Sequence, residues 1–146
     1  MKILAIDQAT HCGWCCGKDL YGMWDISNRK DESSGMRLIR FKAKLREVIQ
    51  SEDIKLVAYE RVASQYKSSV ILLSKMVGII ETMCEEMGIQ YVAFSAKEIK
   101  VFATGKGGSK KAEMIAAARE KYGYLGDDDN EADAMHMYHL ARSLYD

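Results

Sequence analysis

The sequence of 146 residues contains no proline, no excess of either charge and no long apolar run. The absence of proline removes one marker of domain boundaries, and no linker or internal repeat divides the sequence, so we expect one domain over residues 1–146. A membrane span needs about 18 consecutive apolar residues. No run reaches that length, so we expect no membrane association. The first residues turn acidic too early for a signal peptide, which predicts a cytoplasmic protein.

Cysteine is present, but the sequence lacks the partners that would make it a metal or redox site. Cys12 and Cys15 have the spacing of half a zinc site, yet no second such pair and no histidine pair follows at a matching distance. A redox pair would lie at the start of a helix, whereas residues 11–17 have the pattern of a strand. We therefore expect the four cysteines to be reduced and to serve in packing.

The net charge of zero argues against nucleic-acid binding, but the distribution of charge argues for it. Five basic residues lie within 36–47 and five lysines within 97–111, where they flank a glycine-rich loop. Acidic residues are concentrated within 127–133. Basic segments around an acidic centre are typical of a protein that binds phosphates and holds metal at one point. The alternative is that the basic segments are solvated faces of helices.

Hydrophobic periodicity predicts an α/β protein with five strands and five helices in the order βββαβαβααα. Strands are expected over residues 2–7, 11–17, 20–27, 54–60 and 89–94. Helices are expected over about 35–50, 68–87, 96–104, 110–122 and 130–144, with Ser95 and Ser109 as caps of the third and fourth. This order predicts a mixed five-stranded sheet, a β-meander followed by parallel strands, flanked by helices.

Three acidic residues lie at the ends of separate hydrophobic segments. Asp7 and Glu60 each close a predicted strand, and Asp133 lies at the head of the last predicted helix. A carboxylate beside buried residues carries a desolvation cost of several kcal/mol unless something compensates it. Residues at the C-terminal ends of neighbouring strands share a crevice. Three such residues therefore predict convergence on divalent cations.

Asn130 lies three residues before Asp133 and so shares its face of the predicted helix. Its amide oxygen is a candidate fourth ligand, although a role as helix N-cap explains an asparagine here equally well. Ligation by oxygen atoms alone suits Mg²⁺ or Mn²⁺ better than zinc.

The order of these motifs resembles the RuvC-type Holliday junction resolvases, which belong to the ribonuclease H-like (retroviral integrase-like) nucleases. The resemblance covers nearly the whole chain. It rests on four segments: residues 3–10 with Gly13-Trp14, residues 57–60, residues 104–107 followed by Lys110-Lys111, and residues 130–134. The short length of the chain and the residue sequence of its last segment look most like the phage and prophage branch of the family.

The resemblance implies an endodeoxyribonuclease that cuts Holliday junctions by two-metal phosphodiester hydrolysis. Asp7, Glu60 and Asp133 would be the catalytic residues and would bind two Mg²⁺ ions, for which Mn²⁺ substitutes. One ion would activate the attacking water and the other would stabilise the leaving oxygen. The products would carry 5′ phosphate and 3′ hydroxyl groups.

The resemblance also implies partners and a location. Lys106, with Lys110 or Lys111, would bind backbone phosphates. Family members are homodimers, which suits a two-fold symmetric four-way junction. A bacterial cytoplasm, with the gene carried by the host or by a phage, is the expected setting.

Two departures from the family pattern modify these expectations. The family usually has an acid at the position of Asn130, so neighbouring Asp129 is a second candidate for the fourth ligand. An aromatic wedge that opens the junction normally follows the second carboxylate, where this chain has Ala63. Tyr66, beside Lys67, is the candidate substitute and DNA contact. Without a wedge, we expect broader cutting of branched DNA, including flaps and forks.

Three alternatives remain. Actin-like ATPases and sugar kinases share this fold, but they need a second large domain that 146 residues cannot supply. The loop at residues 105–108 lacks the ending and the preceding strand of a Walker loop. A catalytically silent DNA-binding protein or nuclease-fold regulator is the third alternative, and the retention of three carboxylates argues against it. His136 shares the face of Asp133, and packing is favoured over metal or phosphate contact.

Overall fold

The computed structural model describes residues 1–63 and 67–146. Its strands are β1 (Ile3–Asp7), β2 (His11–Gly17), β3 (Leu20–Asp25), β4 (Leu56–Glu60) and β5 (Gln90–Phe94). Its helices are α1 (Gly35–Ser51), α2 (Lys67–Met87), α3 (Ala96–Thr104), α4 (Lys111–Tyr122) and α5 (Asp129–Tyr145). The element order βββαβαβααα is the predicted one.

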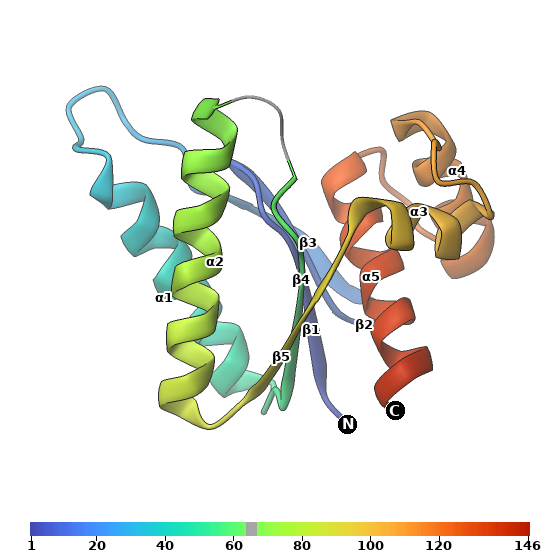
Figure 1. The fold of residues 1–146 in the computed structure, drawn as a ribbon, viewed down its shortest axis with the longest axis horizontal. Helices are drawn as coiled ribbons and strands as arrows, with labels where there is room; N and C mark the ends of the chain where they lie inside the picture. The colour runs from blue at the N-terminus through green and yellow to red at the C-terminus, as the bar shows by residue number, and fades with distance from the viewer. Residues whose placement is uncertain (64–66) are drawn as a thin grey trace.

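The five strands form one mixed sheet with the order β3-β2-β1-β4-β5. β1, β2 and β3 are joined as an antiparallel meander, and β1, β4 and β5 run parallel. This arrangement confirms the predicted α/β fold with a meander followed by parallel strands. The C-terminal ends of β1 and β4 therefore lie side by side at one edge of the sheet (Figure 1).

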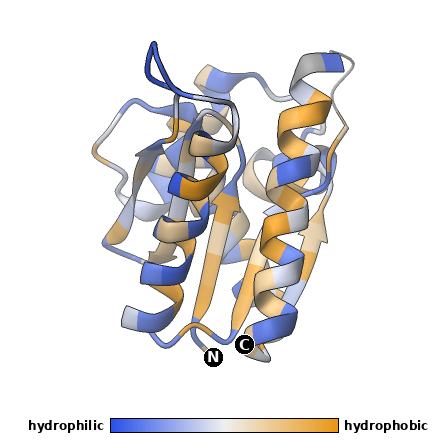
Figure 2. Cartoon of the chain, turned by 90° about the vertical axis from the view of Figure 1, so that its left-hand side faces the viewer, coloured by the Kyte–Doolittle hydropathy of each residue, from blue (hydrophilic) through white to orange (hydrophobic). Residues whose placement is uncertain are grey.

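Helices cover both faces of the sheet, with α1 and α2 on one side and α3, α4 and α5 on the other (Figure 1). β1 is buried along its whole length, as expected of a central strand covered on both faces. Alternate residues serve alternate cores. Leu4 and Ile6 join the core under α1 and α2, whereas Ile3 and Ala5 join the core under α5. Figure 2 shows these apolar strands behind α1 and α2, whose visible faces carry both hydrophilic and hydrophobic residues.

One of the two predicted serine caps differs from the prediction. Ser95 caps α3 as predicted: its hydroxyl accepts from the Glu98 N–H at 3.1 Å, and the Glu98 carboxylate accepts from the Ser95 N–H. Ser109 was predicted to cap α4, but the N-cap is Lys110. The Ser109 side chain is buried and its hydroxyl donates to the Lys106 carbonyl at 2.9 Å. The serine therefore closes the preceding loop instead of the helix.

The four cysteines are free and buried, which confirms their predicted role in packing. Burial raises the pKa of the Cys15 thiol to about 12 and that of the Cys16 thiol to about 11, so neither is a reactive thiolate near neutral pH. Trp14 and Trp24 stack on each other with ring centroids 5.7 Å apart, as sheet and core aromatics. Within the residues that the structure describes, no helix is both long and apolar enough to cross a membrane.

Candidate active site

The alternation of side chains along β1 and β4 brings Asp7 and Glu60 to the same face of the sheet. Ile3 and Ala5 of β1 point toward α5, so Asp7, two residues further, points the same way. Leu56 and Ala58 place Glu60 on that face in the same manner. The parallel register pairs Ile6 with Tyr59, so Asp7 and Glu60 occupy the next rung. The sheet thus presents two carboxyl groups together, facing α5.

The first turn of α5 lies directly against β2. Gly13 pairs with Asp7 in the β1–β2 ladder, and a Cβ atom at position 13 would overlap the backbone carbonyl group of Asn130. The Asn130 side chain adds a hydrogen bond, since its Nδ2 donates to the His11 carbonyl at 2.8 Å. This contact brings Asp133, one turn into the helix, over the ends of β1 and β4.

The start of α5 is fixed by its own capping residue and by a tyrosine. Asp128 is the N-cap, and its carboxylate accepts from the Glu131 N–H at 2.9 Å. The Tyr124 hydroxyl accepts from the Asp128 N–H at 2.9 Å and donates to the Glu131 carboxylate at 2.6 Å. The alternative role of Asn130 as N-cap is therefore wrong.

Burial raises the pKa of all three carboxyl groups, and neighbouring acids raise it further for Asp7 and Asp133. Burial raises the pKa of Asp7 well above its usual value, and the charges of Asp133 and Glu60 raise it further. Burial and the charges of Glu60 and Asp129 raise the pKa of Asp133 to about 7. The pKa of Glu60 is also raised by burial, although a hydrogen bond from Asp7 and the charge of Lys100 act against the rise. The cluster carries more negative charge than its surroundings neutralise.

The chemistry of these side chains fits a divalent cation. Asp133 Oδ1 is buried and has no hydrogen-bond partner among residues 1–63 and 67–146, so this oxygen can serve as a metal ligand. All donors are oxygen atoms, which suits Mg²⁺ or Mn²⁺. Within residues 1–63 and 67–146, no group of three or more acidic, histidine or cysteine side chains is placed so that it could already hold a metal ion.

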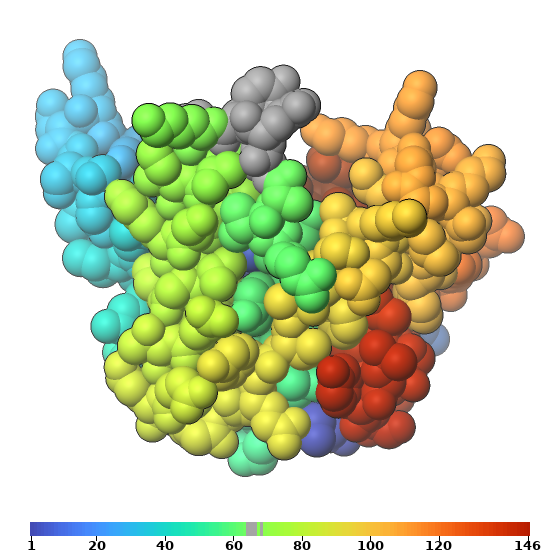
Figure 3. All heavy atoms as spheres, viewed as in Figure 1, coloured from blue at the N-terminus to red at the C-terminus, as the bar shows by residue number. Residues whose placement is uncertain are grey.

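A cavity of about 500 Å³ opens beside these carboxyl groups, between the end of β4 and α3, α4 and α5. Its ionisable lining consists of Glu60, Asp129, Asp133, Lys100, Lys110 and Lys111. Figure 3 shows the residues at the end of β4 (green) facing those of α4 (orange) on the upper side of the molecule. A rim of lysines around a carboxylate centre has the charge pattern that a phosphodiester backbone requires.

The two candidates for a fourth ligand differ in their place relative to the cavity. Asp129 lines it, and the charge of Asp129 raises the pKa of both Asp7 and Asp133. Asn130 lies outside the lining residues and uses its amide on the His11 carbonyl. Lys111 Nζ lies 3.7 Å from Asp129 Oδ2, which links the carboxylates to the lysine rim.

A family model described as crossover junction endodeoxyribonuclease RuvC matches residues 20–134, most of the chain. The chain belongs to the RuvC family. The matched range contains Glu60 and Asp133. Asp7 lies in β1, which precedes the matched range.

Solved RuvC structures share this fold. The structure of RuvC from Thermus thermophilus has a TM-score of 0.75 at 20% identity, covering 94% of this chain and 91% of that one. The same protein in complex with a Holliday junction substrate has a TM-score of 0.77 at 20% identity, covering 99% and 94%. The yeast mitochondrial Holliday junction resolvase Ydc2 has a TM-score of 0.63 at 9% identity, covering 94% and 75%. No curated protein matches the sequence significantly. The likeness confirms the predicted ribonuclease H-like fold.

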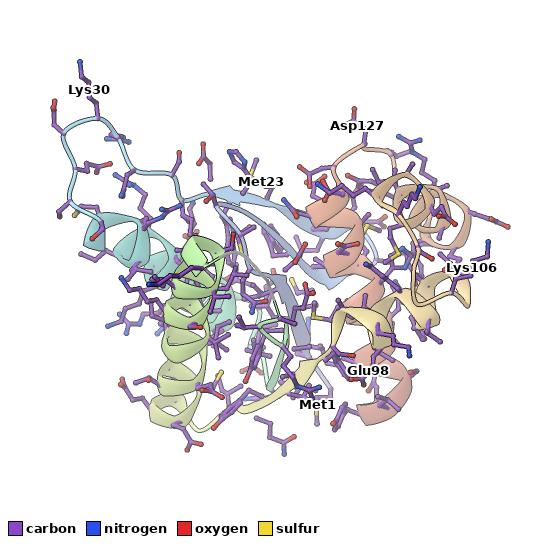
Figure 4. The ribbon with its side chains drawn as sticks, turned by 45° about the horizontal axis from the view of Figure 1, so that its top comes forward. Met1, Met23, Lys30, Glu98, Lys106 and Asp127 are labelled. Carbon is purple, nitrogen blue, oxygen red and sulfur yellow. The ribbon has the colours of Figure 1, made fainter. Side chains whose placement is uncertain are left out.

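The residues predicted to contact DNA lie at different places around this RuvC site. Lys110 and Lys111 line the cavity. Lys106 lies on the loop between α3 and α4, where its side chain is 76% exposed and projects into solvent (Figure 4). Lys67 begins α2 and is exposed. Tyr66 lies outside the described residues, and Ala63 is exposed.

Sequence reasoning missed two residues of the site. Lys100 lines the cavity and lowers the pKa of Glu60 and Asp133. Lys100 belongs to the five lysines within residues 97–111, and its place in the predicted helix over 96–104 was the signal that could have identified it. Gln8 is buried beside Asp7 and hydrogen-bonds to the backbone of Glu60. Nothing in the sequence marks it beyond its place directly after a strand-end acid.

His136 has no contact with the carboxylate cluster. It is fully buried, with Nδ1 3.0 Å from the Tyr122 hydroxyl and Nε2 2.9 Å from the Met114 carbonyl. Burial lowers the pKa of His136, so the ring is neutral near pH 7. The favoured interpretation of this histidine as a packing residue is confirmed.

Proposed function

We propose that this RuvC-family protein is a Mg²⁺-dependent, structure-selective endodeoxyribonuclease that cuts Holliday junctions and other branched DNA. The observation that carries the proposal is the convergence of Asp7, Glu60 and Asp133 from two strands and one helix, with raised pKa values and one carboxylate oxygen left without a partner. Such a cluster is unfavourable for stability alone, and a bound cation compensates its charge.

Asp7, Glu60 and Asp133 would hold the metal, and Asp129 is the better supported fourth ligand. Asp129 lines the same cavity as Glu60 and Asp133, whereas Asn130 is not among the lining residues and its Nδ2 donates to the His11 carbonyl. Two divalent ions, when bound, supply activation of a water molecule and stabilisation of the leaving 3′ oxygen, which yields 5′ phosphate and 3′ hydroxyl ends. Mn²⁺ should substitute for Mg²⁺, because both favour oxygen ligands.

The lysines would position the DNA strand over this centre. Lys110 and Lys111 line the cavity next to the carboxylates, where each can neutralise a backbone phosphate. Lys106 and Lys67, both exposed, would contact phosphates further from the scissile bond. Lys100 lies close enough to Glu60 and Asp133 to lower the pKa of each, so it would hold these carboxylates in their charged form.

Branched DNA is the substrate class that this chain's likeness supports. The protein from Thermus thermophilus that it resembles over 99% of its length is in complex with a Holliday junction substrate. Because Ala63 replaces the aromatic wedge of the family, we propose that flaps and forks are cut as well. A homodimer would place two such centres across a two-fold symmetric junction.

The direct test compares substrates. Purified protein is incubated with labelled four-way junction, flap, fork and linear duplex, each with Mg²⁺ or with EDTA. The proposal expects cutting of the branched substrates with Mg²⁺ and no cutting in EDTA. Cutting of linear duplex at an equal rate would contradict branch selectivity. Binding of junctions without cutting in either Mg²⁺ or Mn²⁺ would favour the alternative, a catalytically silent junction-binding protein.

A further inference from the structure

The side chain of Gln8 makes two hydrogen bonds to the backbone of a single residue, Glu60. Gln8 Nε2 donates to the Glu60 carbonyl at 2.7 Å, and the Glu60 N–H donates to Gln8 Oε1 at 2.9 Å. Gln8 is only 6% exposed, so water competes little for these bonds. Both polar groups of the primary amide are therefore committed to the main chain of one carboxylate residue.

The sheet explains why Glu60 needs such a partner. The parallel β1–β4 ladder ends with the pair Ile6 and Tyr59, whereas the pairing of β1 with β2 on its other edge continues to Asp7 and Gly13. On its other side, Glu60 pairs with Phe94 of β5. The Gln8 amide supplies the donor and acceptor that a further residue of β1 would have offered. The side chain thus extends the β1–β4 ladder by one rung, beyond the point where the two strands separate.

Resting on the function proposed above, we propose that Gln8 is a positioning residue that fixes the Glu60 carboxylate relative to that of Asp7. Gln8 directly follows Asp7, so its amide connects the backbone of one acidic residue to the backbone of the other. Backbone position sets the direction of a side chain. A displacement of about 1 Å in a catalytic group can cost a hundredfold in rate. Gln8 therefore acts through Glu60, without contacting metal or DNA.

A positioning role and a purely stabilising role predict different effects of replacing Gln8. If Gln8 served stability alone, its replacement would lower the melting temperature and leave metal affinity and the rate constant of the folded protein unchanged. If Gln8 positions Glu60, its replacement weakens metal binding and lowers kcat at temperatures where the protein is folded. Junction binding measured with Ca²⁺ is unaffected in either case, because it depends on the lysines, whereas both polar groups of the Gln8 amide bond to the Glu60 backbone.

The experiment compares Gln8→Met, which keeps the length of the side chain but removes both hydrogen bonds, with Gln8→Asn, which keeps the amide but is too short to reach. Gln90→Met is the matched control, because Gln90 lies exposed at the opposite end of the sheet and opposes Leu56. Mn²⁺ affinity is measured without DNA by electron paramagnetic resonance, and kcat on a four-way junction is measured at saturating Mg²⁺. Circular dichroism at the assay temperature verifies folding.

We expect both Gln8 variants to bind Mn²⁺ at least fivefold more weakly and to lower kcat at least tenfold, while Gln90→Met stays within twofold of the unmodified protein. A folded Gln8→Asn variant that keeps both values within twofold would overturn the positioning role, and it serves as the deciding variant if Gln8→Met fails to fold. An unmodified protein that binds Mn²⁺ but cuts no branched DNA would overturn the proposed function alone, and the Mn²⁺ comparison would still decide the role of Gln8.

Discussion

The Cα atom of Gly13 lies so close to the backbone carbonyl of Asn130 that no side chain fits between β2 and α5. This contact determines how near Asp133 comes to Asp7, the partner of Gly13 in the β1–β2 ladder. A glycine is required there because any Cβ atom would push the helix away from the sheet. The close packing of α5 on β2 thus completes a site whose carboxylates come from β1, β4 and α5.

Replacing Gly13 with alanine should therefore damage both stability and activity. The overlap forces α5 outward, and overpacking of this kind typically costs about 1–3 kcal/mol. We expect junction cutting to fall by at least tenfold, because Asp133 is displaced from Asp7 and Glu60. Urea unfolding and single-turnover cleavage measure the two effects. Gly17→Ala is the control: its Cβ atom would meet only Leu20 Cβ, at an ordinary 3.5 Å. Equal losses in both variants would contradict this account of α5 docking.

Removing a carboxylate should stabilise the protein in the absence of metal. The pKa of Asp133 is about 7 in the folded protein, against about 3.9 in an unfolded chain. Between these values the folded state keeps a proton that the unfolded state has released, so the free energy of unfolding falls as pH rises from about 4 to about 7. The raised pKa of Asp7 acts in the same direction.

We accordingly expect Asp133→Asn to melt several degrees above the unmodified protein in EDTA at pH 8, with a difference that disappears toward pH 4. Differential scanning calorimetry across this range measures it. Mg²⁺ should raise the melting temperature of the unmodified protein and have little effect on the variant. A variant that melts lower at pH 8 in EDTA would contradict the electrostatic strain described here.

Asp129 and Asn130 can be distinguished by their metal requirement. Asp129→Asn should raise the Mg²⁺ concentration needed for half-maximal cutting several-fold, because it removes a negative charge from the cavity that Glu60 and Asp133 line. Asn130→Ala removes the hydrogen bond to His11 and should shift the Mg²⁺ requirement less. Asp127→Asn, in the exposed loop before α5 (Figure 4), is the control. A larger shift for Asn130→Ala than for Asp129→Asn would identify the amide as the ligand.

The lysine rim should control the salt dependence of DNA binding. Each phosphate contact that is lost lowers the slope of log K against log salt by about 0.9 for duplex DNA. We expect Lys110→Ala and Lys111→Ala each to reduce the slope by about one, with a similar effect of Lys106→Ala if that exposed lysine reaches a phosphate. Lys55→Ala, at the far end of β4, is the control. Fluorescence anisotropy with a labelled junction in Ca²⁺ provides the measurement. Slopes unchanged in all three variants would place the DNA elsewhere.

The sequence predicted the fold and the proximity of Asp7 and Glu60, because both depend on alternation along strands. A short apolar run that ends in an acid can be recognised in the sequence, and the strand order then places Asp7 and Glu60 side by side. The choice between Asp129 and Asn130 depended on where α5 begins. A shift of one residue rotates a side chain by about 100° around a helix, and only the cap at Asp128 decides the phase. Gln8 was missed because a polar residue after a strand usually marks a turn, and its two hydrogen bonds depend on tertiary structure.

The most direct test of the central claim, that Asp7, Glu60 and Asp133 form one metal-dependent nuclease centre, is the behaviour of Asp7→Asn. Cleavage of a four-way junction in Mg²⁺ and binding of the same junction in Ca²⁺ are measured on one preparation, with Asp19→Asn, at the exposed β2–β3 turn, as the control. The account expects Asp7→Asn to cut at least a thousandfold more slowly while binding the junction within threefold of the unmodified protein. An Asp7→Asn protein that still cuts at a comparable rate would contradict it.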